Sequence, residues 1–433
     1  MNLIQNVLKS LILYREKYLE PRSIYSIAGS LGKLSRQWLN KDFFYRRKAL
    51  EKLVKNSGFT KKMSEALLDA LFTGITEKKL LKLLQAEIQN PRFLDGFQKD
   101  PVSGNFRRAR GPRLVTHIFS GNVPNPALLS FIFGMLVKSV NIGKCSSKDE
   151  GFLGIYLESL RALDPQLAAT NTILKPTIGA QYAAPLRECI EQSGLVVAYG
   201  NNESLKEIKN HLPAGTPFLG YGHKVSFSFY AKECLTPKNS QVLAKKTAHD
   251  IWMLDQRGCL SPATIYIEGG GIISPHNFAG FLARSLESLS VGAHGLAPLH
   301  RTLHHAQILN RYTIRKIKGE NIRFWESSVK GRWLVIYEDK NDLPLSSGQQ
   351  VIYVKGLKNT ESLYKTLLPM QKYLQAVALE AGAARRLQIS EKLAQLGINR
   401  ICRAGQMQEP PLFWRHDGLP NLASWLKWTD LEY

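Results

Sequence analysis

The stretch Arg113–Lys144, RLVTHIFSGNVPNPALLSFIFGMLVKSVNIGK, has the pattern of one strand–helix–strand unit of a layered α/β fold. A short β-rich run ends at Gly121 and leads through a proline-containing loop into an apolar helical stretch. A second strand-like segment, SVNIGK, follows that stretch. The apolar run Ala127–Val137 is shorter than the roughly 20 residues that cross a bilayer. It predicts a buried helix, and we expect no integral membrane segment.

The alternation of strands and helices continues along the chain. GFLGIYLESLRAL (residues 151–163) indicates a helix, and GLVVAYG (194–200) indicates a strand that leads into another helix. A second α/β segment begins near Ala248, with the strand ATIYIE (263–268), and residues 363–389 have the pattern of one long helical region. This order predicts an α/β fold with a doubly wound parallel sheet, which binds ligands beyond the carboxyl ends of its strands.

The first part of the chain has a different pattern. Residues 1–95 place apolar residues at helical spacing with lysines between them, which predicts a helical N-terminal region rather than a signal peptide. The chain of 433 residues is too long for one compact core. We therefore predict three parts: a helical region over 1–95 and two α/β segments over 96–247 and 248–433.

The formal net charge is +23, and the first 110 residues carry 22 Lys and Arg against 10 Asp and Glu. Such a charge attracts phosphorylated small molecules, anionic membranes or nucleic acid, although a solvated helical surface would have the same composition. No RNP motif or zinc finger is present, so we expect no nucleic-acid partner. The five cysteines are scattered without metal-ligand spacing, which favours free thiols, a cytoplasmic location and no metal site.

Two candidate site residues follow strand-like runs. In HIFSGNVPNPAL, the glycine and prolines hold Asn122 in an irregular loop, where its side-chain amide is a candidate donor to a developing oxyanion. Alternatively, Asn122 bonds only to its own turn. Lys144 ends the next strand-like run, where a doubly wound sheet meets a ribose or phosphate, although a lone lysine there is often only solvated.

A third candidate is the junction VVAYGNNESLKEI. A buried strand runs into Gly200, and small polar residues then cap a helix that begins near Glu203. Backbone N–H groups at such a junction point toward an anion. No GxGxxG sequence is present, so the junction alone also fits an ordinary turn.

The fourth candidate is Cys259 in DQRGCLSPATIYIEGGG, residues 255–271. The neighbouring Arg257 would favour the thiolate, and a turn before the strand would expose the sulfur. The alternative is a small buried hydrophobic residue at a tight turn. The three glycines after the strand predict a turn.

Taken in order, DQRGCLSP, GNVP, NIGK, VAYG and the closing WRHDGLPNLASWLKW resemble the aldehyde dehydrogenase superfamily, and more closely its LuxC-type acyl-CoA reductase branch. The resemblance covers roughly residues 100–433. Asn122 lies 22 residues before Lys144, and Gly200 lies 59 before Cys259, as that family spaces them. The resemblance implies that Asn122 holds the oxyanion, Lys144 contacts the cofactor ribose, Gly200 forms the cofactor turn and Cys259 is the nucleophile.

The resemblance also implies the function. It implies an aldehyde dehydrogenase-like fold, with a Rossmann-type cofactor domain over 96–247 and a catalytic cysteine domain over 248–433. The implied activity is NADPH-dependent reduction of a long-chain fatty acyl-CoA to the aldehyde through an acyl-cysteine. A homo-oligomer and an acyl-protein synthetase partner are implied by the same analogy.

Two departures from the family pattern bear on mechanism. Gly220, in GYGHK, stands where oxidising members carry a glutamate base, so water attack on a thioester should be slow. This favours reduction over aldehyde oxidation and leaves His223 and Arg257 as candidates to assist Cys259. The family's Glu-x-Phe-Gly-Pro stretch has no clear equivalent, and the region around Glu338 is the one candidate.

Two rival functions fit the same residues. One is reduction of an acyl-phosphate or a carrier-bound acyl group, which uses the same cysteine chemistry. The other is a non-catalytic basic binding or scaffold protein on the same fold. Turnover of acyl-CoA against acyl-phosphate separates the first rival, and an absence of nicotinamide oxidation with any acyl-CoA would favour the second.

Overall fold

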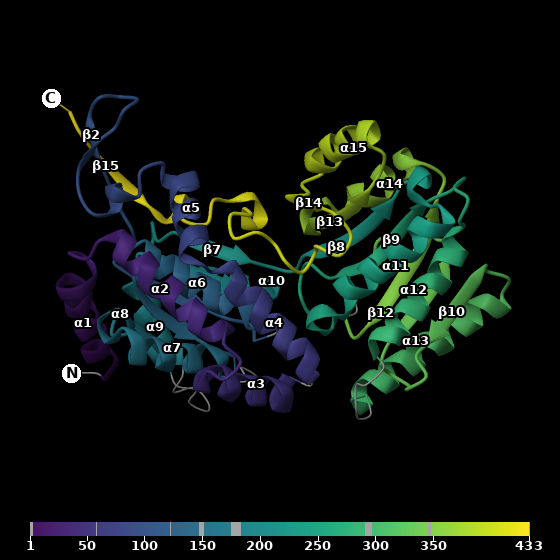
Figure 1. The fold of residues 1–433 in the computed structure, drawn as a ribbon, viewed down its shortest axis with the longest axis horizontal. Helices are drawn as coiled ribbons and strands as arrows, with labels where there is room; N and C mark the ends of the chain where they lie inside the picture. Colours follow the sequence, from purple (N-terminus) through teal and green to yellow (C-terminus); the bar gives the residue numbers. More distant parts are fainter. Residues whose placement is uncertain are drawn as a thin grey trace. The chain divides into compact units, whose positions relative to one another are not determined.

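The computed structural model describes residues 3–57, 59–121, 123–146, 151–174, 183–290, 297–344 and 348–432. The chain forms two compact units. The first consists of Met1–His223 together with Pro411–Tyr433, and the second consists of Lys224–Pro410 (Figure 1). Each unit is built around its own parallel sheet, so the predicted α/β class is confirmed.

The sheet of the first unit has five parallel strands in the order β5-β4-β3-β6-β7. Their bounds are β3 Leu114–Ile118, β4 Val140–Lys144, β5 Asn171–Leu174, β6 Leu195–Tyr199 and β7 Phe218–Tyr221. Counted from β3, this is the 3-2-1-4-5 order of a nucleotide-binding sheet. The order reverses between β3 and β6, so a ligand site is expected at the carboxyl ends of these two strands.

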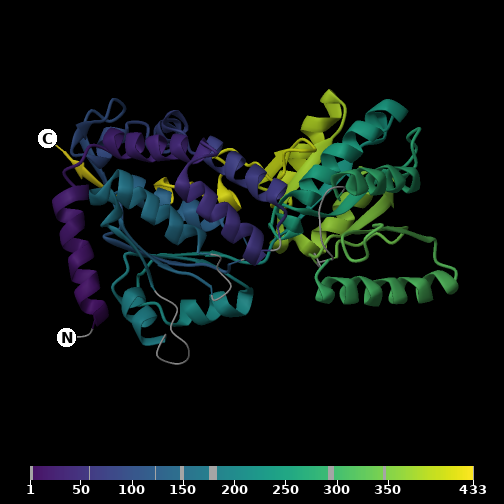
Figure 2. The same ribbon diagram turned by 60° about the horizontal axis from the view of Figure 1, so that its bottom comes forward.

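Helices cover both faces of this sheet (Figure 2). On β3, Val115 packs in one core cluster with helices α6 and α7, whereas Leu114 packs on the opposite side with α1 and α9. Ile118 packs with α9 and α10. The helices concerned are α1 Leu3–Tyr14, α6 Asn125–Leu136, α7 Phe152–Leu163, α9 Ala183–Glu191 and α10 Asn202–Asn210. Both faces of the strands are buried, as is usual in a doubly wound sheet.

The remaining N-terminal helices extend the core of the first unit. They are α2 Ile24–Leu39, α3 Phe44–Ser57, α4 Lys61–Gly74 and α5 Glu77–Ile88. Trp38 is fully buried, stacks on Phe72 at 4.6 Å and donates from Nε1 to Ser159 Oγ of α7 at 3.0 Å. One hydrophobic cluster joins these helices to the sheet, so the helical region predicted over 1–95 is part of the first unit and not a domain of its own.

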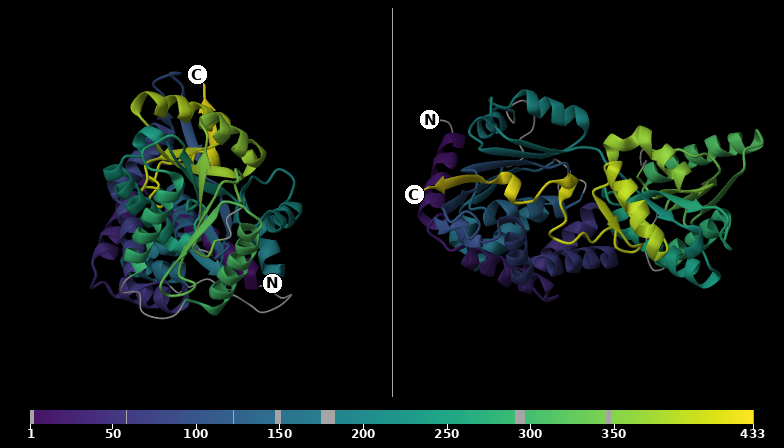
Figure 3. Two further views of the ribbon diagram at one scale, coloured as in Figure 1. Left: turned by 90° about the vertical axis from the view of Figure 1, so that its right-hand side faces the viewer. Right: turned by 90° about the horizontal axis from the view of Figure 1, so that it is seen from above.

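The C-terminal segment completes the first unit. Strand β15 (Lys427–Leu431) pairs antiparallel with β2 (Phe106–Arg110), which also pairs with β1 (Gln98–Lys99). The Glu87 carboxylate accepts hydrogen bonds from the backbone N–H groups of residues 421–423. Figure 3 shows this segment running back along the first unit.

The second unit has a seven-stranded sheet in the order β10-β11-β12-β9-β8-β13-β14, in which β10 alone is antiparallel to its neighbour. The strands are β8 Val225–Tyr230, β9 Pro262–Glu268, β10 Ile322–Glu326, β11 Leu334–Glu338, β12 Val351–Leu357, β13 Leu374–Glu380 and β14 Arg400–Cys402. The helices are α11 Pro237–Trp252, α12 Pro275–Ser290, α13 Leu299–Ile317, α14 Thr360–Leu367 and α15 Ala383–Gln395. Helices α14 and α15 share a core cluster with β8, while α12 packs against β11 and β12.

Several short helices lie between these elements. They are α8 Pro165–Ala168, the π-helix Arg15–Leu19, and the 3₁₀ segments Pro91–Leu94, Lys232–Cys234, Met253–Gln256, Leu368–Tyr373, His416–Gly418 and Ala423–Trp425. No helix within the described ranges is long and apolar enough to cross a membrane. The apolar run 127–137 belongs to the buried helix α6, as predicted.

Two expectations differ from the structure. The boundary between the α/β parts lies at His223/Lys224 and not at 247/248, because β8 pairs with β9 and β13 of the second sheet, and residues 411–433 return to the first unit. The single long helix expected over 363–389 is wrong. Strand β13 interrupts it and pairs with β8 and β14 in the second sheet.

Candidate functional site

Candidate residues of the first unit gather at the carboxyl edge of its sheet. Lys144 is the last residue of β4, Gly200 follows β6, and Gly121 follows β3 by a short link. Because β4, β3 and β6 are adjacent and parallel, these positions share one edge. Asn122 lies outside the described residues, between Gly121 and Val123.

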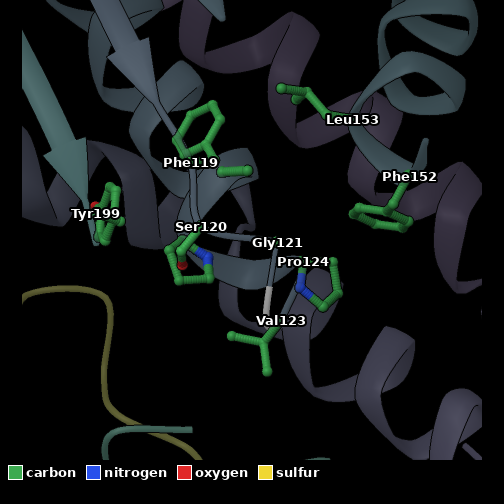
Figure 4. Close-up of a pocket in the computed structure, with 10 residues that line it drawn as sticks. Phe119, Ser120, Gly121, Val123, Pro124, Phe152, Leu153 and Tyr199 are labelled. Carbon is green, nitrogen blue, oxygen red and sulfur yellow. The ribbon is translucent and has the colours of Figure 1, made fainter. Parts of the chain in front are cut away.

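An apolar pocket lies at this edge, where the strand order reverses (Figure 4). Its volume is about 40 Å³. Its lining comes from the β3–α6 loop and the start of α6 (Phe119, Ser120, Gly121, Val123, Pro124, Pro126, Ala127), the start of α7 (Phe152, Leu153) and the end of β6 (Tyr199). Gly121 and Val123, which flank the predicted oxyanion donor in the sequence, both line this pocket.

The β6–α10 junction has the geometry that its sequence predicts. Asn201 caps α10, and its side chain accepts a hydrogen bond from Ser204 N at 2.8 Å. The helix begins at Asn202, one residue before the predicted start. A Cβ atom built on Gly200 would make only ordinary contacts, with Ser204 and Leu205, so space does not require a glycine there. The junction places a helix N-terminus at the same edge as Lys144.

An aromatic stack lies at the neighbouring strand ends. The ring of His416 is parallel to that of Tyr221, with centroids 4.3 Å apart, and Tyr221 stacks on Tyr199 at 4.7 Å. The Trp414 ring lies next to that of His416, with centroids 5.0 Å apart. The WRHDGLPNL motif carried the family resemblance without an assigned role, and the structure places its first residues at the carboxyl ends of β6 and β7.

A buried polar network supports the middle of the sheet beneath this edge. His117 of β3 bonds through Nδ1 to Ser130 Oγ at 2.8 Å and through Nε2 to Asn141 Oδ1 at 2.9 Å. Asn141 donates in turn to Asn171 Oδ1. Burial lowers the pKa of His117 to about 4, and the hydrogen bond with Asn141 only partly opposes this shift. The imidazole is therefore neutral at physiological pH, and the network fixes the register of β3, β4 and β5.

Cys259 lies in the second unit, on the turn that precedes β9, and it is exposed. The backbone before it is unusual, because Leu254, Asp255 and Gln256 all have positive φ, between 53° and 58°. Left-handed backbone costs a non-glycine residue roughly 1–2 kcal/mol. Exposure excludes the alternative of a buried cysteine at a turn.

Side chains hold this strained turn. The Asp255 carboxylate forms a bidentate ion pair with Arg301 of α13 and a further bond with Arg257 at 3.2 Å. The Gln256 amide donates to the carbonyls of Pro262 and Val351. Backbone strain that is held in this way is typical of functional sites.

The turn is also tied to neighbouring strands. Ser226 of β8 donates from Oγ to the Cys259 carbonyl at 2.7 Å, and Gln408 donates to Ser261 Oγ at 2.8 Å. The glycine turn after β9 is present as predicted, with Gly270 at φ +82°. Cys259 is therefore an exposed thiol on a fixed backbone.

The residues proposed to assist Cys259, or to replace the missing motifs, lie as follows. Arg257 is exposed and pairs with Asp255, while His223 is the last residue of the first unit.

Gly220 lies on β7, where a Cβ atom would approach the Phe218 ring to 2.7 Å. Glu338 ends β11 and is buried, and Lys355 and Arg315 bind its carboxylate at 2.9 and 3.0 Å. The Glu338 carboxylate is therefore already bound by two cations within the second unit.

Sequence reasoning missed several polar residues beneath the Cys259 turn, among them Asp250 of α11 and Arg400 of β14. Only the tertiary fold brings them to Cys259, and no local motif marks them. Among the described residues, no group of three or more His, Cys, Asp or Glu side chains is arranged to hold a metal ion.

Comparison with known structures supports the aldehyde dehydrogenase-like fold. The NAD-dependent benzaldehyde dehydrogenase of Corynebacterium glutamicum superposes with a TM-score of 0.72 at 10% identity, covering 99% of this chain and 90% of that one. The succinic semialdehyde dehydrogenase of Streptococcus pyogenes, solved with NADP+ as the cofactor, gives 0.72 at 12% identity, covering 99% and 94%. The predicted fold is confirmed.

Sequence comparison is more specific. The long-chain acyl-protein thioester reductase of Photorhabdus luminescens is 22% identical over 428 residues, covering 96% of this chain and 83% of the relative. That of Vibrio harveyi is 23% identical over 403 residues, covering 90% and 80%. The model of the family described as acyl-CoA reductase (LuxC) matches residues 19–428. The chain therefore belongs to the LuxC family of acyl-CoA reductases.

Proposed function

We propose that this protein reduces a long-chain fatty acyl thioester to the aldehyde through an acyl group carried on Cys259, with NADPH as the electron donor. The observation that carries the proposal is the position of Cys259, an exposed thiol on a strained and fixed turn, in a chain of the LuxC family. Acyl-CoA and an acyl-protein both present the acyl group as a thioester, and the relatives named above are acyl-protein thioester reductases.

The chain's own residues account for the acyl transfer. The Cys259 thiolate attacks the thioester carbon, and the oxyanion that forms accepts a hydrogen bond from the Asn122 side-chain amide. The sulfur of the acyl donor then leaves and is protonated to a thiol. The C–S bond to Cys259 then replaces the C–S bond to the donor. With Gly220 in place of a glutamate base, the acyl-cysteine should resist hydrolysis and persist until it is reduced.

The first unit fits a nicotinamide dinucleotide. Its strand order reverses between β3 and β6, α10 presents its N-terminus beyond β6, and Lys144 ends β4. We assign Lys144 to the ribose and the Gly200 turn to the dinucleotide backbone. When bound, the reduced nicotinamide supplies the hydride that converts the acyl group to the aldehyde level, and Cys259 is then released as the thiolate.

We assign the pocket lined by Gly121 and Val123 to the start of the acyl chain. Its lining also includes the Ala127 and Leu153 side chains. Burying each methylene there contributes about 0.8 kcal/mol, and a volume of about 40 Å³ has room for about two of them.

Mass spectrometry after acyl transfer without reductant tests the proposal. The full chain is incubated with palmitoyl-CoA in the absence of NADPH, and we expect one palmitoyl group, located on Cys259 by peptide mapping. Cys259→Ala should lose both the adduct and aldehyde formation, whereas Cys234→Ala, at a half-buried cysteine, should keep both. An adduct that survives in Cys259→Ala would refute the assignment.

Parallel reactions with three acyl donors test which donor and which nicotinamide cofactor the protein uses. Palmitoyl-CoA, a palmitoylated protein and palmitoyl phosphate are each supplied with NADPH or with NADH, and aldehyde is measured. A preference for the phosphate would favour the acyl-phosphate rival. A synthetase partner and a homo-oligomer remain predictions.

A further inference from the structure

The loop after β14 lies against the Cys259 turn. Asp250 of α11 accepts hydrogen bonds from Gly405 N at 2.6 Å and Met407 N at 2.9 Å. Gln408 donates from the same Nε2 to the Asp250 carbonyl at 2.9 Å and to Ser261 Oγ at 2.8 Å. The loop is thus bonded to a residue two positions after the cysteine.

One buried arginine organises this loop. Arg400, the first residue of β14, is 7% exposed and donates from Nη1 to the Met407 carbonyl and from Nη2 to the Gln406 carbonyl, each at 2.6 Å. Both acceptors are carbonyls that orient the guanidinium, and the Asp250 carboxylate also interacts with its charge. A buried charge is screened far less than one at the surface.

Sheet geometry places this charge at the same edge as the cysteine. Strands β9, β8, β13 and β14 are consecutive and parallel, so their first residues lie at one edge. Ser226 of β8 pairs with Pro262 of β9 and bonds to the Cys259 carbonyl, and Arg400 pairs with Ala376 of β13.

Electrostatics link the two residues directly. Burial lowers the pKa of Arg400, and the neighbouring Cys402, Asp250 and Cys259 oppose that shift. The interaction is reciprocal, because a thiolate that favours the guanidinium cation is itself favoured by that cation. The charged groups around the turn include Asp250, whose pKa is raised to about 7 by burial, Arg257 and Asp255, which pair with each other, and Arg301, which is bound to Asp255.

We propose that Arg400 is the positioning residue that maintains Cys259 as a thiolate, by holding the 404–408 loop against the turn and by placing a buried positive charge behind it. This inference rests on the proposed nucleophile, and it answers what replaces the missing glutamate.

The pH profile of Cys259 alkylation tests the proposal. The full-length protein is treated with iodoacetamide from pH 5 to 10, and modification of the Cys259 peptide is followed by mass spectrometry. We expect Arg400→Met to shift the half-maximal rate to higher pH, so that alkylation at pH 7 is roughly tenfold slower while the plateau at high pH is unchanged. Arg400→Lys, which keeps the charge, should retain most of the wild-type profile.

The controls separate charge from packing. Arg403→Met removes an arginine that is about half exposed and paired with Glu380 near the same strand end, and it should leave the profile unchanged. If Arg400 had a purely structural role, Arg400→Met and Arg400→Lys would both change the plateau rate of alkylation without moving the pH midpoint. That result would overturn the proposal. If Arg400→Met does not fold by circular dichroism, Arg400→Gln, which keeps a donor for the two carbonyls, carries the same test.

Alkylation does not depend on the reductase reaction. If Cys259→Ala still carries an acyl adduct, the proposed function fails whatever the alkylation profile shows. If Cys259 takes the acyl group but Arg400→Met leaves the alkylation midpoint in place, only the role of Arg400 fails.

Discussion

Arg301 and Asp255 form a bidentate ion pair, with Nη1 and Oδ1 at 3.0 Å, at the middle residue of a left-handed backbone run. Both side chains are about nine-tenths buried. The pair joins the start of α13 to the turn that carries Cys259. The strain of that turn is therefore balanced by a contact with a separate helix.

Breaking this pair should weaken both the fold and the nucleophile. We expect Arg301→Met to lower the free energy of unfolding by about 3 kcal/mol, because a buried carboxylate loses its main partner. Acyl transfer to Cys259 should slow, since the turn relaxes toward ordinary φ values. Urea unfolding and single-turnover acylation measure the two effects. Arg323→Met, on an exposed position of β10, is the control, and equal stability of the two variants would contradict the expectation.

Lys144→Ala should affect the nucleotide and spare acyl transfer. Losing one hydrogen bond to a charged group costs about 1.5 kcal/mol, so KM for NADPH should rise roughly tenfold. Formation of the acyl-cysteine without NADPH should be unchanged. Steady-state kinetics and intact-mass measurements make the comparison, with the exposed Lys82→Ala of α5 as control. Slower acylation in Lys144→Ala would show that this lysine acts in acyl transfer and not only in cofactor binding.

Filling the pocket should shorten the preferred acyl chain. Ala127→Trp places a large ring in a pocket of about 40 Å³, and losing room for two methylenes costs about 1.6 kcal/mol. We expect kcat/KM to fall about tenfold for palmitoyl-CoA and to change little for acetyl-CoA, whose acyl group has no methylene. Ala169→Trp, at a half-buried position outside this pocket, should leave the chain-length profile as in the wild type. A parallel loss at every chain length would argue against this pocket as the acyl site.

The first unit should lose stability in acid through His117. Its pKa is lowered to about 4 in the folded state and is near 6.5 when unfolded, so the unfolded chain binds more protons between these values. The contribution is full above pH 6.5 and is lost as pH falls toward 4, with a total of about 3 kcal/mol. Urea unfolding at pH 7.5 and pH 5 should show a smaller loss for His117→Gln, by about 2 kcal/mol. The exposed His211→Gln should behave as the wild type, and an unchanged pH slope in His117→Gln would assign acid unfolding to other groups.

Much of the first sheet could be predicted from the sequence. Strands β3 and β4 are short, largely apolar runs bounded by glycine or polar residues, and α6 between them is mostly apolar. Strand ends locate Lys144 and Gly200, and parallel pairing then places both at one edge. For these residues, local pattern and tertiary structure agree.

The second sheet shows where local pattern fails. Strand β13, LQAVALE, is composed largely of good helix formers, and it is buried along its whole length. Nothing in it favours a strand until β8 and β14 pair with it. Similarly, only residues 222–224 separate β7 from β8, yet the two strands belong to different sheets.

The polar residues beneath Cys259 could not be predicted for the same reason. Arg400 lies far along the chain from the cysteine and stands in no motif. Its role depends on the two carbonyls that it binds and on the order of four strands. The family resemblance could suggest Cys259 as the nucleophile, but no sequence pattern could suggest Arg400.

The return of residues 411–432 to the first unit determines the order in which the protein can be assembled during synthesis. The second unit is one continuous stretch and can fold as soon as it leaves the ribosome, whereas the first needs both ends of the chain. Until residues 421–431 have been synthesised, β2 lacks its β15 neighbour and Glu87 lacks its backbone donors. The first unit is therefore completed after the second, although most of it is made first.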